Sequence, residues 1–327
     1  MNKIEIITLK ALRKIYGKLF KPKSSTYDRG ITDPDKASEL IYNLLASGKP
    51  CMIARYGAFE LASVINYIGV SNSRHSYLKY ISGKAPQWWW NKRLMGFMQS
   101  NAGFFPSTES NLMRFGDLIL EDSKLVDILG SWQKNELYLS SVLTEAKKIQ
   151  LMYLDPFWSK KPWSRALDGK KVLVVHPFAE SIKSQYEKRK YLFKVQDTLP
   201  DFKSLEVIKA IQSIGGDSNG YKDWFEALEY MMSEIDKHDY DVCLIGSGAY
   251  GFPLAAHVKR MGKQAIHMGG SLQLLFGIMG NRWDHDEPHY ENGVFIYYAG
   301  LENEYWVRPS ASERPKSHKV VENSCYW

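Results

Sequence analysis

Cysteine is scarce in this chain, and no two cysteines are spaced as a metal-binding pair would be. The three cysteines, Cys51, Cys243 and Cys325, lie far apart among 327 residues, and the first two fall within apolar runs typical of buried strands. An odd, scattered set argues against a disulfide framework and against a cysteine zinc site. The sequence therefore predicts buried thiols in a reducing cytoplasm.

Long apolar runs are also missing, so the sequence predicts neither a signal peptide nor a membrane span. Net positive charge is small outside the first 23 residues. That segment holds seven basic residues and Glu5, a balance of +6, which leaves only +1 of the net +7 for the remainder. A nucleic-acid enzyme needs a basic groove in its folded body, so we expect no nucleic-acid partner.

The basic segment has a helical apolar pattern, formed by Ile4, Ile7, Leu12, Ile15, Leu19 and Phe20. A basic amphipathic helix of this kind lies on anionic membrane surfaces. The alternative is an ordinary first helix packed on the body. The first reading predicts a cytoplasmic protein, peripherally associated with the inner membrane through residues 1–23, with residues 1–30 forming this helix and a polar linker.

The stretch from Asp239 to Trp283 predicts the fold class. An apolar strand over 241–245 is followed by a glycine turn, a helix over 252–261, a second strand over 263–267 and the pair Gly269–Gly270. A strand, a helix and a parallel strand in this order form a βαβ unit, so we expect an α/β protein. Ligands of such sheets bind beyond the carboxyl ends of the strands, where both glycine turns fall.

The first glycine turn has two interpretations. Glycines let backbone N–H groups approach a phosphate at a helix N-terminus, which predicts a sugar-nucleotide pocket. Alternatively, the turn only connects strand to helix. The spacing is not that of a P-loop, and His267 replaces the acidic ribose partner of an NAD site. The candidate pocket residues of this turn are Gly246, Ser247, Gly248, Ala249, Tyr250 and Gly251.

Two further predicted strands end in polar residues. The strand over 51–54 leads to Arg55 and Glu60, which suit a phosphate and a metal or sugar hydroxyl; alternatively, the two pair as a structural clasp. The strand over 171–175 ends at His176, with Glu180 on the next helix. His176 is a candidate hydrogen-bond donor or general base, and Glu180 either orients it or is itself the base. Alternatively, His176 only forms a hydrogen bond with a neighbouring turn.

Between these strands, residues 71–160 are expected to form an aromatic, mostly helical insert. Helices are predicted over 112–120, 125–130 and 137–146, and Trp88–Trp90 is read either as core or as a stacking surface for sugar or lipid. We divide the body into a first half, 31–160, and a second half, 161–327, whose last residues are expected to form a loose tail.

A family resemblance rests on short motifs. The segment 55–60 resembles the Arg-Phe-Gly-Asp-x-Glu signature of the GT-D type of bacterial glycosyltransferase, and 241–283 is similar to that family's second half. The segments 176–178, 248–253 and 267–283 resemble uncharacterised proteins of bacterial surface-polysaccharide clusters, such as those for capsule or O-antigen. The similarity spans most of 35–308. It implies two Rossmann-like halves around one cleft, and sugar transfer from a nucleotide-sugar to a polysaccharide or lipid-linked acceptor.

The resemblance also implies roles for residues. Arg55, Gly57 and the glycine turn would hold the diphosphate, while Glu60 would bind a divalent metal, Mn²⁺ or Mg²⁺, or a donor hydroxyl. His176 and Glu180 would serve the acceptor or leaving group. The sequence departs from the signature at Ala58, which stands where the family has aspartate. That departure raises an alternative, a non-catalytic sugar-nucleotide-binding or scaffolding protein. Further pocket candidates are His267, Gly269, Gly270 and Gln273.

Overall fold

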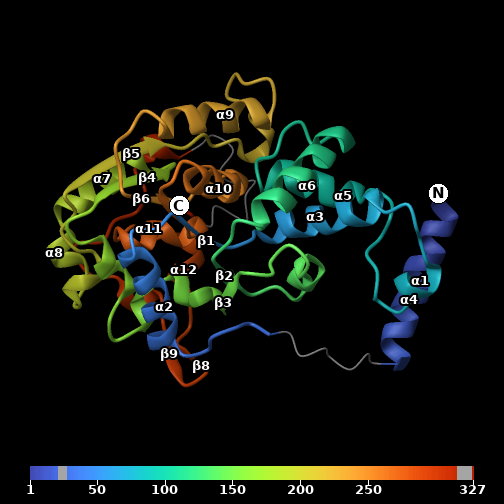
Figure 1. Ribbon diagram of the computed structural model, residues 1–327, viewed down its shortest axis with the longest axis horizontal. Helices are drawn as coiled ribbons and strands as arrows, with labels where there is room; N and C mark the ends of the chain where they lie inside the picture. Colours follow the sequence, from blue (N-terminus) through green and yellow to red (C-terminus); the bar gives the residue numbers. More distant parts are fainter. Residues whose placement is uncertain (21–27, 315–325) are drawn as a thin grey trace.

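The computed structural model describes residues 1–20, 28–314 and 326–327. Its centre is a seven-stranded sheet in the order β3-β2-β1-β7-β6-β4-β5, in which all neighbouring strands run parallel (Figure 1). The strands are β1 (Cys51–Ala54), β2 (Ile128–Ser131), β3 (Lys147–Gln150), β4 (Lys171–His176), β5 (Ser204–Lys209), β6 (Val242–Ile245) and β7 (Gln264–His267).

Both faces of the sheet are covered by helices, which is why β1, β6 and β7 are buried along their whole length. On β1, Met52 and Ala54 pack into one apolar layer, whereas Cys51 and Ile53 pack into the other. The first layer contains α3 (Ala58–Ser71), α5 (Lys92–Ser100), α6 (Glu109–Ser123), α9 (Trp224–Ile235) and α10 (Gly251–Arg260). The second contains α2 (Pro34–Ala46), α7 (Ala179–Glu187), α8 (Arg189–Leu192), α11 (Leu272–Leu275) and α12 (Asn281–Asp284).

This doubly covered parallel sheet is a Rossmann-like α/β fold, so the predicted fold class is confirmed at that level. Both predicted halves contribute strands to it, since β1 of the first half pairs with β7 of the second. Aspartate side chains cap two of the helices. Asp33 caps α2 and Asp223 caps α9, each side chain accepting a backbone N–H three residues on.

Two helix predictions in the first half were wrong. Residues 125–130 lead into β2, because Ile128 and Leu129 pair with β1 on one side and β3 on the other. Residues 137–146 contain the end of a short 3₁₀ helix, η1 (Lys134–Leu139), and turns that lead to β3. In residues 125–130, pairing with two parallel neighbours outweighed the helical spacing of the apolar residues. Residues 71–160 therefore supply two strands of the central sheet as well as helices.

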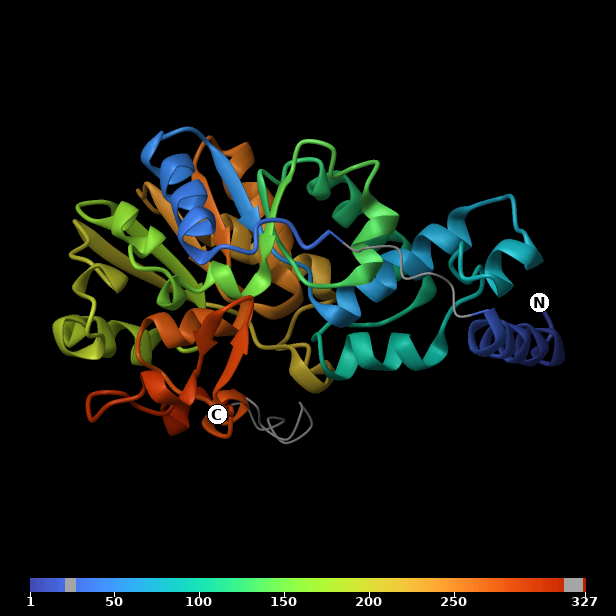
Figure 2. The ribbon, with the colours of Figure 1, turned by 90° about the horizontal axis from the view of Figure 1, so that it is seen from below.

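The first helix, α1 (Lys3–Phe20), lies with α4 (Tyr77–Ile81) at one end of the molecule, away from the sheet (Figures 1 and 2). Leu9 is buried there, and the Arg13 guanidinium lies 4.6 Å from the centre of the Tyr80 ring. The predicted helix is confirmed; Lys21, Lys23 and most of the predicted linker fall outside the described residues. In the described ranges, no helix combines the length and apolarity needed to cross a bilayer.

Two smaller features complete the fold. An antiparallel ribbon, β8 (His289–Glu291) with β9 (Val294–Ile296), stands apart from the main sheet. Cys51 and Cys243 are buried thiols, as predicted, and burial raises the pKa of the Cys51 thiol to about 12. Cys325 lies outside the described residues.

Candidate functional site

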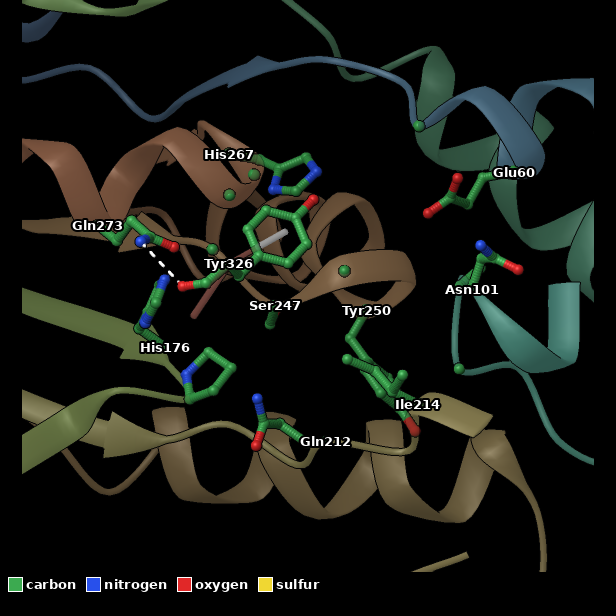
Figure 3. A pocket seen from close by; sticks show the side chains of 18 of the residues that line it. Glu60, Asn101, His176, Gln212, Ile214, Ser247, Tyr250, His267, Gln273 and Tyr326 are labelled. Carbon is green, nitrogen blue, oxygen red and sulfur yellow. Dashed lines mark hydrogen bonds between the residues drawn. The ribbon is translucent and has the colours of Figure 1, made fainter. Parts of the chain in front are cut away.

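A cavity of about 200 Å³ lies at the carboxyl ends of β1, β7, β6 and β4, which are adjacent in the sheet (Figure 3). Parallel strands bring their carboxyl ends to one edge, so the polar residues that follow them meet there. The predicted residues that line the cavity are Arg55, Gly57, Glu60, His176, Gly246, Ser247, Gly248, Tyr250, His267, Gly269, Gly270 and Gln273.

Arg55 follows β1 and brings a positive charge to the cavity. Its side chain is partly exposed, but the Nε atom is buried and has no hydrogen-bond partner within the described part of the chain. The guanidinium lies 5.5 Å from the centre of the Trp132 ring. Burial lowers the pKa of Arg55, and the nearby Glu60 carboxylate opposes that shift. A cation with an unsatisfied N–H at a strand end is suited to an anionic ligand.

Glu60 sits in the first turn of α3, and Gly57 caps that helix without a side-chain hydrogen bond. A Cβ atom at Gly57 would lie only 1.9 Å from Glu60 Oε2, so the carboxylate folds back over the space that glycine leaves. A negative charge is favourable at a helix N-terminus. A side chain at Gly57 would therefore displace the Glu60 carboxylate from its present position at the cavity wall.

Two buried histidines line the cavity as neutral groups. His176 Nδ1 accepts the Phe178 N–H at 3.0 Å, which leaves the proton on Nε2. Burial lowers the pKa of His176 to about 3. Burial and then the Arg55 charge lower the pKa of His267 to about 3 as well, and His267 Nδ1 lies 3.3 Å from the Ile245 carbonyl oxygen. A histidine of such low pKa is a weak base, so the geometry favours hydrogen-bond donation by His176 over proton abstraction.

The glycines of the turn before α10 differ in their surroundings. A Cβ at Gly251 would lie 2.2 Å from His267 Cε1, and one at Gly246 would lie 2.6 Å from His176 Cδ2. These two glycines make room for histidine rings. Gly248 differs: its φ of +55° favours glycine, and a Cβ there would meet nothing closer than the Ala102 carbonyl oxygen at 3.8 Å. Only Gly248 leaves open space that a ligand can use.

Two more polar atoms of the wall have no partner within the described residues, the buried Ser247 Oγ and Gln273 Oε1. The amide nitrogen of Gln273 is satisfied, donating to the carbonyl oxygens of Ile278 at 3.1 Å and Tyr326 at 3.3 Å (Figure 3). Buried polar groups in folded proteins are nearly always hydrogen-bonded. Together with Arg55 Nε, these two atoms indicate a place where a polar ligand completes the bonding.

Three predicted site residues do not line the cavity. Glu180 is on α7, with its side chain 73% exposed and paired with Lys183 at 3.3 Å, so its proposed partnership with His176 is not formed. The helix begins at Ala179 and turns Glu180 toward solvent. Ala249 is buried in the apolar core, and Gly251 packs against His267.

The sequence analysis missed several lining residues, among them Asn101, Trp132, Gln212, Arg282, Tyr326 and Trp327. Trp132 directly follows β2, so recognising that strand would have pointed to it. The prediction of a loose tail was wrong for Tyr326 and Trp327. Trp327 is only 3% exposed and lies 5.9 Å from the Phe178 ring, centre to centre. Residues 315–325 lie outside the described ranges.

The side chains of the described residues do not assemble a metal site by themselves. Within the described ranges no group of three or more His, Cys, Asp or Glu side chains could hold an ion, and Glu60 is the only acidic residue that lines the cavity. Ala58, at the position of the signature aspartate, also lines it. Neither a family model, nor a curated protein, nor a solved structure matches this chain.

Proposed function

We propose that this protein is a glycosyltransferase of the GT-D type, which moves a sugar from a nucleotide-sugar to a bacterial surface-polysaccharide or lipid-linked acceptor. The supporting observation is that Arg55, Glu60, His176 and Gly248 meet at one cavity on the carboxyl edge of a parallel sheet. That edge is where Rossmann-like folds bind nucleotides. The unpartnered Nε of Arg55 carries the argument, because it requires an acceptor that the described residues do not supply.

In this proposal the diphosphate lies between Arg55 and the turn before α10. The Arg55 guanidinium and the backbone N–H groups around Gly248 stabilise the negative charge of the departing diphosphate, and preorganised charge of this kind is usually the largest catalytic contribution. The neutral His176 donates its Nε2–H, and Glu60 accepts a hydroxyl of the donor sugar. Glu180 has no part, because its side chain is in solvent.

A divalent ion has a restricted place in the proposal. Glu60 alone does not fit an ion held by protein side chains, so an Mn²⁺ or Mg²⁺ ion would need phosphate oxygens of the donor as further ligands. A bound ion would offset diphosphate charge. No step of the proposed reaction is assigned to it.

The alternative function is a non-catalytic sugar-nucleotide-binding or scaffolding protein, favoured by Ala58 in place of the signature aspartate. Slow hydrolysis of a nucleotide-sugar in the absence of acceptor separates the two. If the protein is a transferase, wild type should release nucleoside diphosphate faster than the Glu60→Ala variant. The control is Glu121→Ala, which changes an exposed glutamate of α6 and should release it as fast as wild type. Equal rates for all three proteins at the uncatalysed background would favour the scaffold.

We further propose that α1 lies on the anionic surface of the inner membrane from the cytoplasmic side. Several of its apolar residues are not covered by the body: Ile4 is 77% and Leu19 is 71% exposed, and Leu78 on the neighbouring α4 is 79% exposed. Lysines interleave with these residues along α1. Apolar exposure with basic charge is the pattern of an interfacial helix.

Vesicle flotation tests this placement. The full chain should float with phosphatidylglycerol vesicles and much less with phosphatidylcholine vesicles, and the double variant Ile4→Ser, Leu19→Ser should lose flotation. Replacing the buried residue of the same helix, as in Leu9→Ala, should weaken flotation less. Undiminished flotation of the double variant would contradict the proposal.

A further inference from the structure

A second cavity, of about 390 Å³, adjoins the first at the outer half of the sheet. Ser131 and Gln150, the last residues of β2 and β3, form part of its wall, so it extends the same carboxyl edge. The two cavities share five wall residues, Arg55, Trp132, Gly270, Arg282 and Tyr326. Arg55 therefore stands at the junction between them.

The second cavity is lined by a buried carboxylate, Asp155, which is not among the predicted site residues. Asp155 is 6% exposed, and its Oδ2 accepts the Tyr298 hydroxyl at 2.6 Å. Its Oδ1 is buried and receives no hydrogen bond in the described part of the chain. The nearby Ser271 hydroxyl donates to the Met268 carbonyl oxygen, at 3.4 Å. A buried carboxylate oxygen without a donor is costly, unless a ligand supplies the donor.

The remaining wall indicates the class of that ligand. Four aromatic rings line the cavity together with the carboxylate, and two further lining residues, Arg29 and Glu291, form a partly exposed ion pair at 3.3 Å. Aromatic faces pack against the apolar faces of sugar rings, while carboxylates accept hydrogen bonds from sugar hydroxyls. The rings are those of Trp132, Trp283, Tyr298 and Tyr326.

We propose that the second cavity binds a sugar unit of the acceptor, one hydroxyl of which donates a hydrogen bond to Asp155 Oδ1. This proposal deepens the proposed function and rests on it, because the bound sugar is an acceptor only if the protein is a transferase. The first cavity holds the donor, and the shared Arg55 marks the place where the two substrates meet. A purely structural Tyr298–Asp155 pair would explain Oδ2, but it leaves Oδ1 unexplained.

Binding of simple sugars tests the proposal without knowledge of the natural acceptor. The probes are the methyl glycosides of glucose, galactose, mannose and N-acetylglucosamine, observed by saturation-transfer NMR on the full chain. At least one should bind wild type, and Asp155→Asn should weaken its binding tenfold or more. The exposed Asp168, which lies outside both cavities, provides the matched control Asp168→Asn, which should bind as wild type does.

A second variant distinguishes loss of sugar binding from a folding defect in Asp155→Asn. Ser271 lines only the second cavity, so Ser271→Trp should block the glycoside and preserve binding of UDP or GDP. Three results would overturn the proposal: no glycoside binds wild type, Asp155→Asn binds it equally well, or a nucleoside diphosphate displaces it. If glycosides bind through Asp155 while no nucleotide binds, the sugar site survives and the transferase proposal fails.

Discussion

Replacing Asp155 by asparagine should stabilise the protein at neutral pH, although Asp155 lies in a candidate site. Burial raises the pKa of this carboxyl from 3.8 to about 6, against the opposing effects of the Ser271 and Tyr298 hydroxyls and of the Arg55 charge. The folded state therefore holds the Asp155 proton more tightly than the unfolded state. That preference stabilises the fold below pH ~4 and is lost as the pH rises toward 6.

The size of the effect follows from the two pKa values. A difference of about two pH units at 1.36 kcal/mol per unit gives about 3 kcal/mol. Asparagine resembles the protonated carboxyl and does not titrate. The free energy of unfolding of Asp155→Asn should therefore equal that of wild type near pH 4. Relative to wild type it should rise by about 1.4 kcal/mol per pH unit between pH ~4 and ~6, and it should stay about 3 kcal/mol higher above that range.

Urea unfolding of both proteins at pH values from 4.5 to 8 measures this difference directly. Asp122, whose pKa burial also raises to about 6, titrates in the same window. It is common to both proteins and cancels in the difference. Parallel stability curves for wild type and Asp155→Asn, or a less stable variant at pH 7, would refute the reasoning.

Two other predictions concern the glycine turn and the histidines. Gly251→Ala should lower the free energy of unfolding by about 1–3 kcal/mol, because the added Cβ would lie 2.2 Å from the His267 ring. The control, Gly96→Ala, adds a Cβ at an open helical position and should be neutral or stabilising. Thermal unfolding of both variants checks this, and similar melting temperatures would contradict it. His176 and His267 should stay neutral from pH 8 to 5, since burial lowers the pKa of each to about 3; a midpoint near 6.5 in imidazole ¹⁵N spectra would show otherwise.

Local sequence patterns were sufficient for the strands that carry the first cavity. The runs at 51–54, 171–175 and 241–245 are short and largely apolar, and they are followed by Arg55, His176 and Gly246, respectively; the more polar run at 263–267 ends at His267. The sequence could not give their order in the sheet. Pairing of β1 with β7 joins residues more than 200 positions apart, and that pairing brings Arg55 to His267.

Where the sequence failed, non-local contacts decided the outcome. The segment before Trp132 has helical spacing but pairs with two strands, so a cavity residue was missed together with its strand. Tyr326 has a polar neighbourhood in sequence, yet its ring lies 4.7 Å from the Arg282 guanidinium carbon. Glu180 is near His176 in the sequence, but the first turn of α7 places its side chain in solvent.

The spacing of glycines could not reveal which of them faces a ligand. Gly246 and Gly251 look equivalent to Gly248 in the sequence, but they accommodate histidine rings that come from other strands. The same limit applies to Asp155. Nothing in its neighbourhood in the sequence indicates that its partner, Tyr298, comes from beyond the β8–β9 ribbon.

The most direct test of the central claim is calorimetric titration of nucleoside diphosphates into wild type and Arg55→Gln. If Arg55 binds the diphosphate, losing its charge-assisted hydrogen bonds should weaken the best-binding nucleotide by roughly 10- to 100-fold, corresponding to about 1.5–3 kcal/mol. The exposed Arg74→Gln should bind as wild type does. Equal affinity of Arg55→Gln and wild type, or no binding of any nucleoside diphosphate, would contradict the account.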